Sequence, residues 1–133
     1  MRRFAAAFLT LAAATSPAGS QPAAGVDWSS AQSVNLLLTD DAFVPDHLTF
    51  RHAVPYRLHL ENHGKELHEF TAPEFLAASI VRQPDLLANG GKEIVVQPGT
   101  AVDVELVPLN PGSYRLICAD HDWDGMVGEI TVE

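Results

Sequence analysis

The stretch SYRLICADHDWDGMVGEITVE (residues 113–133) contains two apolar runs, SYRLIC and VGEITVE, on either side of the polar segment ADHDWDGM. Each run has the length and composition of a β-strand, so the stretch predicts two consecutive strands joined by one loop. Cys118 then ends the first strand, His121 lies in the loop, and Met126 comes directly before the second strand. A loop of this length can direct a thiol, an imidazole and a thioether towards one point.

Similar apolar runs occupy much of the preceding chain, at residues 33–39, 47–51, 55–62, 93–97 and 100–107. Several of them alternate with period two, so that Tyr56, Leu58 and Leu60 would face one side of a sheet while polar residues face the other. Pro-Gly pairs at residues 98–99 and 111–112 supply tight turns between runs. The seven runs together predict an all-β fold, an antiparallel β-sandwich.

One segment departs from this strand pattern. Residues 73–91 contain good helix formers at helical spacing, with Pro84 as a stop and the glycines at 90 and 91 as an exit. The segment predicts a short helix or two, inserted in one long connection between strands.

The N-terminal part of the chain has the layout of an exported protein. Residues 1–18 combine a basic start, an apolar run at 4–14 and small residues, which predicts a secretory signal peptide cleaved after Ala18. The apolar run is too short to span a bilayer, although a retained anchor is the alternative. Residues 19–32 predict a flexible N-terminal segment, and residues 33–133 predict a single folded domain.

The net charge and the single cysteine limit the classes of function that the protein can have. The formal net charge of −9 argues against nucleic acid as a partner. Oxidising compartments favour disulfides, but Cys118 is the only cysteine of the chain. Three interpretations of this residue are open: a buried apolar side chain, an intermolecular disulfide, or a metal ligand.

The thiol, thioether and imidazole of the loop suit copper, and a His, His, Cys set with a weak axial Met is the blue-copper arrangement. A second histidine must therefore come from elsewhere. Three of the six histidines lie in or beside predicted strands and are expected on the surface: His47, His52 and His59. His63 and His68 follow a strand end, and His68 is the better candidate because apolar Leu67 and Phe70 flank it.

Three segments resemble the cupredoxins, the family of small type 1 copper proteins: FVPDHLTF (43–50), NHGKELHEF (62–70) and YRLICADHDWDGMVGEITV (114–132). The resemblance implies a Greek-key β-sandwich of about seven strands, with one mononuclear copper ion near one end that alternates between Cu(I) and Cu(II). Carried over by position, the implied copper ligands are His68, Cys118, His121 and Met126. Considered alone, Met126 could equally be a buried core residue, and His121 could equally be a surface residue.

The resemblance further implies an exported, periplasmic electron carrier that is not an enzyme. We expect a monomer without a membrane span in the mature chain, and a redox partner with a basic docking surface. A copper-delivery, copper-tolerance or metal-uptake accessory protein would use the same site. A metal-free β-sandwich that serves as an interaction module is the second alternative.

Three features near the predicted site depart from the family pattern or have two interpretations. Glu69 follows His68 where many cupredoxins have an amide or a hydroxyl residue. Aspartates at 120, 122 and 124 surround His121 and favour a lowered reduction potential. Trp123 is either a docking surface or a shield over the loop, and we favour the shield.

Overall fold

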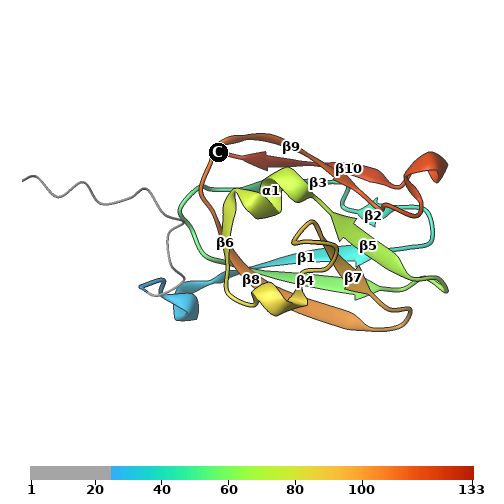
Figure 1. The fold of residues 1–133 in the computed structure, drawn as a ribbon, viewed down its shortest axis with the longest axis horizontal. Coiled ribbons are helices and arrows are strands. Elements are labelled where there is room, and N and C mark those ends of the chain that lie inside the picture. The colour runs from blue at the N-terminus through green and yellow to red at the C-terminus, as the bar shows by residue number, and fades with distance from the viewer. Residues whose placement is uncertain (1–24) are drawn as a thin grey trace, which may run out of the picture.

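The computed structural model describes residues 25–133, drawn in colour in Figure 1. The predicted signal peptide, residues 1–18, lies outside the described residues, as does the part of the predicted flexible segment at 19–24. The described part of that segment contains a 3-10 turn, η1 (Trp28–Ser30), and the first strand begins at Gln32.

Within residues 25–133, ten strands form two five-stranded sheets. The first sheet has the order β2-β1-β4-β8-β6, with β1 (Gln32–Leu38), β2 (Phe43–Val44), β4 (Tyr56–Asn62), β6 (Ser79–Val81) and β8 (Ala101–Pro108). The second has the order β3-β10-β9-β5-β7, with β3 (His47–Phe50), β5 (His68–Thr71), β7 (Glu93–Val96), β9 (Gly112–Ile117) and β10 (Val127–Val132). The predicted all-β sandwich is therefore confirmed, with ten strands in place of about seven.

Strand direction differs from the prediction in two places. β1 pairs with β4 in parallel, and β3 pairs with β10 in parallel, whereas the remaining pairs are antiparallel. The sequence predicted an antiparallel sandwich, and these two parallel pairs are the departures from that prediction. Period-two alternation shows which face of a strand is buried. The alternation is the same whether the neighbouring strand runs parallel or antiparallel, so it does not predict strand direction.

The long connection after β5 contains both helical and extended pieces. Helix α1 (Pro73–Ala77) begins at a proline, which suits the first helical position because the missing N–H has no partner there. β6 follows and pairs with β8. A 3-10 turn, η2 (Pro84–Leu86), then begins at Pro84, where the sequence predicted a stop. The predicted pair of short helical pieces is present, but a strand separates them.

Aromatic side chains fill the centre of the core. Phe50 is fully buried, stacks on Phe75 at 5.2 Å between ring centroids, and meets Tyr56 edge-on at 4.9 Å. Cys118 and Met126 belong to the same buried cluster. The loop between β9 and β10 is therefore anchored in the core by these two side chains. Because protein cores are close-packed, such side chains are hard to displace.

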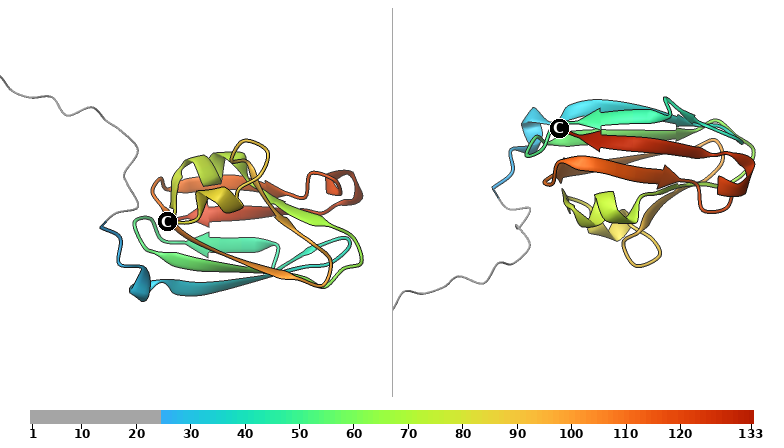
Figure 2. Two further views of the ribbon diagram at one scale, coloured as in Figure 1. Left: turned by 60° about the horizontal axis from the view of Figure 1, so that its bottom comes forward. Right: turned by 90° about the horizontal axis from the view of Figure 1, so that it is seen from above.

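The β9–β10 loop, which carries the 3-10 turn η3 (Asp122–Asp124), lies at one end of the sandwich, with the C-terminus at the other (Figures 1 and 2). The loop between β4 and β5 reaches the same end as η3 (Figure 1). No helix within residues 25–133 is long and apolar enough to cross a membrane.

Candidate metal centre

Two separate segments bring the thiol and an imidazole together. Cys118 directly follows β9 and His68 is the first residue of β5, and both side chains are fully buried. Cys118 Sγ lies 3.7 Å from His68 Nδ1. First-row metals such as zinc bind sulfur at about 2.3 Å and nitrogen at about 2.0 Å, which places two ligands of one ion roughly 3.5 Å apart. The separation of these two atoms fits a shared metal ion.

His121 lies beside His68 on the solvent side of this pair. The two imidazole rings are 4.8 Å apart between centroids, and the His121 side chain is 14% exposed. His121 Nε2 lies 3.2 Å from Glu66 Oε2, so Nδ1 is the ring nitrogen left for a metal.

Backbone hydrogen bonds close the β9–β10 loop at both of its ends. The Cys118 N–H donates to the Met126 carbonyl at 3.1 Å, and the Met126 N–H donates to the His121 carbonyl at 3.2 Å. Gly125 takes a left-handed conformation with φ of 88° at the turn before Met126. Met126 is fully buried, which fits both of its sequence interpretations, a core residue and a thioether ligand.

Asp40 orients His68 from outside the predicted ligand set. His68 Nε2 lies 3.1 Å from Asp40 Oδ1, and the same oxygen accepts the backbone N–H groups of Lys65 and Glu66 at 2.8 and 3.2 Å. His68 and the N–H of Glu66 hold the pKa of Asp40 below its usual value. A carboxylate on one ring nitrogen fixes the tautomer and leaves Nδ1 free to bind a metal.

The β4–β5 loop is shaped to admit this carboxylate. A Cβ at Gly64 would overlap Asp40 Oδ1 and would come within 3.0 Å of His68 Nε2. Buried Asn62 donates to the carbonyls of Glu66 and Val96 at 2.8 and 2.9 Å, and it accepts the Gly64 N–H at 2.8 Å. The amide of Asn62 thereby ties the loop to β7.

We expect Asp40→Asn to weaken metal binding by about 10–100-fold, since partners of this kind contribute that much to affinity at known metal sites. The neutral amide oxygen can still accept from Nε2, but without the negative charge it stabilises the N–H tautomer less. Competition with a copper chelator measures the change. Asp41→Asn is the matched control, because Asp41 contacts Thr39 rather than a histidine. Equal affinities for the two variants would contradict the role of Asp40.

Glu69 makes two contacts with the thiol. Its backbone N–H donates to Cys118 Sγ at 3.3 Å, and its carboxylate Oε2 accepts from the thiol at 3.0 Å. Burial raises the pKa of Glu69, the thiol opposes this shift, and neighbouring Asp120 adds to it. Burial and the Glu69 carboxylate raise the pKa of Cys118 to about 12. The thiol of the metal-free protein is therefore protonated at neutral pH, and a bound cation must displace its proton.

Glu69→Gln is expected to lower the pKa of Cys118 in the metal-free protein. The substitution removes the negative charge next to the sulfur and supplies an amide N–H that can donate to the thiolate. The ultraviolet absorbance of the thiolate, followed against pH, measures the shift. Exposed Glu74, on α1, provides the control Glu74→Gln. A thiol pKa that stays the same in Glu69→Gln would show that burial alone sets it.

Trp123 corrects one expectation. Its side chain is 79% exposed, and its indole N–H donates to the Asp120 carbonyl at 2.9 Å. The expectation that Trp123 packs over the loop as a shield is wrong, because a shielding ring would be buried against the loop and this one is exposed.

The remaining four histidines are outside the candidate metal centre and contact other groups. His47 meets Thr131, and His52 meets the Glu133 carbonyl. His63 is exposed, and His59 is half-buried between two carboxylates. As the side chains of residues 25–133 stand, no three His, Cys, Asp or Glu residues form a closed metal-binding group. His68, His121 and Cys118 are nevertheless neighbours, as the ring and sulfur distances above show.

Comparisons with solved structures agree with the fold. A reduced auracyanin from the photosynthetic bacterium Roseiflexus castenholzii superposes with a TM-score of 0.59 at 16% identity, over 78% of this chain and 98% of the auracyanin. Auracyanin B superposes with a TM-score of 0.58 at 19% identity, over 86% of this chain and 92% of the auracyanin. A multicopper oxidase from Campylobacter jejuni gives 0.57 at 12% identity, over 90% of this chain but 32% of the oxidase.

No curated protein matches the chain. The family model described as the Cupredoxin-like domain matches residues 3–132. With two stacked sheets, a buried cysteine at the end of β9 and a histidine facing it from β5, the chain belongs to the cupredoxin-like family.

Proposed function

We propose that this protein is a type 1 copper protein that carries single electrons between redox partners. The observation that carries the proposal is the 3.7 Å approach of the buried Cys118 thiol to His68 Nδ1, with the ring of His121 beside it. A cysteine and two histidines at one point form the donor set of blue copper, and a buried methionine follows in the same loop.

Each side chain has a separate task in this proposal. Copper would be held by Cys118 as the thiolate, by His68 and His121 through Nδ1, and by Met126 through its thioether. Copper, when bound, supplies the one-electron Cu(I)/Cu(II) couple. The protein supplies a site that changes little between the two states. The bonds from Asp40 to His68 and from Glu69 to Cys118 restrain the first two ligands, while burial excludes water from them.

His121 is the route by which we propose that electrons enter and leave. It is the partly exposed member of the ligand set, and exposed Trp123 and Val127 lie close to it in sequence. Asp120, Asp122 and Asp124 surround it with negative charge. A partner with a basic surface would be attracted to this end, and salt would slow its association. We also propose that the protein acts as an exported, periplasmic monomer.

An enzymatic role is not part of the proposal. The Campylobacter jejuni multicopper oxidase shares the fold, but the chain spans about a third of its length. The sequence also lacks the paired His-x-His segments that bind several copper ions in one centre.

The visible and paramagnetic resonance spectra of the Cu(II)-loaded protein test the proposal. We expect an intense thiolate-to-copper band that disappears on reduction and returns on oxidation over many cycles, with copper retained. A colourless copper complex would contradict the type 1 site. Rapid loss of Cu(I) to a chelator, with the band intact in the Cu(II) form, would instead favour the delivery of copper by the same site.

A further inference from the structure

A second group of histidines and carboxylates lies on β4, apart from Cys118. His59 and Glu61 point to the same face of the strand, and His63 follows its end. His59 Nε2 lies 2.8 Å from Glu61 Oε1, and His63 Nε2 lies 2.9 Å from Glu61 Oε2. Two imidazole nitrogens therefore converge on the two oxygens of one carboxylate.

Asp103 fixes the orientation of His59. The two residues stand opposite each other in the antiparallel pair of β4 and β8, and His59 Nδ1 lies 2.7 Å from Asp103 Oδ1. This bond leaves Nε2 of His59 directed towards Glu61. Metal-binding histidines in proteins commonly have this arrangement, with one ring nitrogen on a carboxylate and the other on the metal.

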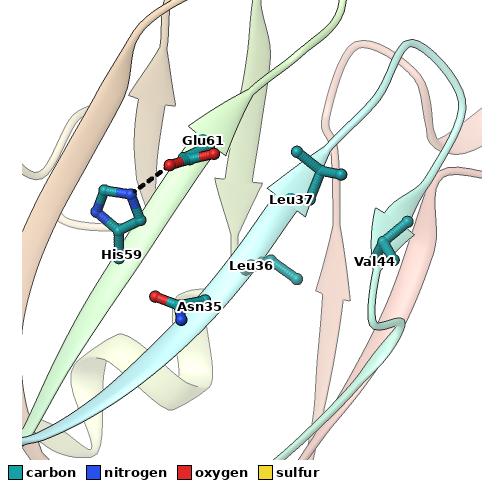
Figure 3. A pocket seen from close by; sticks show the side chains of 6 residues that line it. All are labelled: Asn35, Leu36, Leu37, Val44, His59 and Glu61. Carbon is teal, nitrogen blue, oxygen red and sulfur yellow. Dashed lines mark hydrogen bonds and ion pairs between the residues drawn. The ribbon is translucent and has the colours of Figure 1, made fainter.

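The carboxylate of Glu61 is accessible from two sides. His59 and Glu61 line a surface hollow of about 380 Å³. Figure 3 shows them on one side of it, across from apolar Leu37 and Val44. A second hollow of about 450 Å³ is lined by Glu61 and His63. As they stand, these three side chains do not enclose an ion. The side chains of His59, Glu61 and His63 are 29%, 46% and 60% exposed, so they can reorient around one.

Charge favours a cation at this place. Hydrogen bonds to Glu61 and Asp103 raise the pKa of His59, and those to His59 and His63 lower the pKa of Glu61. On the β1 side, His59 and Glu61 stand opposite Asn35 and Leu37, which carry no charge. Both oxygens of the Glu61 carboxylate face an imidazole nitrogen, and a divalent ion can lie between these groups once the side chains turn.

We propose that His59, Glu61 and His63 form a binding site for a divalent first-row metal ion such as Zn²⁺, with Asp103 as the residue that positions His59. Nitrogen and oxygen donors without sulfur suit Zn²⁺ or Cu²⁺ rather than Cu(I). Binding replaces the two N–H···O contacts to Glu61 with bonds from the same three side chains to the ion. The site is independent of the proposed copper centre, because it shares no residue with it.

Calorimetric titration of the Cys118→Ser protein with Zn²⁺ tests the proposal. This variant lacks the thiolate, so zinc cannot bind to the sulfur of residue 118. We expect one equivalent to bind, and His59→Gln or His63→Gln to weaken binding at least tenfold. Asp103→Asn should weaken it about tenfold, as at other sites with an outer carboxylate. His47→Gln and His52→Gln remove surface histidines outside the group and should leave the affinity unchanged.

A second measurement identifies the ligands directly. In the nuclear magnetic resonance spectrum, addition of Zn²⁺ should shift the ring resonances of His59 and His63 and leave those of His47 in place. Unchanged affinity in both His59→Gln and His63→Gln, or equal losses in the His47→Gln control, would overturn the proposal. The wild-type protein carrying a single equivalent of copper at Cys118 should bind the same equivalent of Zn²⁺, and a failure of copper loading would affect only the proposed function.

Discussion

Cys118→Ser is expected to abolish the intense visible band of the copper-loaded protein and to weaken copper binding by more than about 100-fold. Loss of an outer partner alone costs about 10–100-fold at metal sites, and this change removes the sulfur itself. The band arises from charge transfer between the thiolate and Cu(II), so a serine oxygen cannot reproduce it. Absorption spectra and chelator competition measure the two effects.

The variant should remain folded, which makes the result interpretable. Serine is close to cysteine in size, and its hydroxyl can donate to the Glu69 carboxylate that now accepts from the thiol. Cys118→Ala serves as a control for the new hydroxyl and should show the same loss. An intense band that survives in both variants would exclude Cys118 as a copper ligand.

Phe50→Ala is expected to destabilise the protein by about 3–5 kcal/mol, the range found for fully buried aromatic residues. Phe50 lies in β3 of one sheet, yet its ring meets Tyr56 of the other sheet and Phe75 of α1. Its removal would leave a void between elements that cannot all close on it. Urea denaturation of the metal-free protein measures the change without a contribution from bound copper.

Val44→Ala is the matched control for this loss of stability. Val44 also lies in a strand, but its side chain is 49% exposed. The control should change the free energy of unfolding by less than about 0.5 kcal/mol, as is usual for surface positions. Similar losses in the two variants would show that the Phe50 cluster does not hold the sheets together.

The strands that alternate in sequence could be predicted within a residue or two, and those without alternation could not. β5 is buried at all four positions, so it has no polar face to reveal its period. β2 and β6 have two and three residues, too few for any pattern. These short strands form by pairing with neighbours distant in sequence, and local propensity does not report such pairing.

The candidate site was predictable where its residues share one loop, and less so beyond it. The spacing of Cys118, His121 and Met126 needs only local geometry. Asp40 lies 28 residues before His68, and nothing in its own surroundings marks it as a partner of a histidine. Glu69 stood out as a departure from the family pattern, but its bond to the thiol depends on how β5 meets β9.

The position of the C-terminus has a practical consequence. Glu133 follows β10 at the end of the sandwich opposite η3 (Figure 1). A tether attached there, to an electrode or to a fused carrier, would hold the molecule upright with His121 and Trp123 directed outward. Immobilised in this orientation, the protein would offer its histidine end to soluble proteins and keep it away from the support.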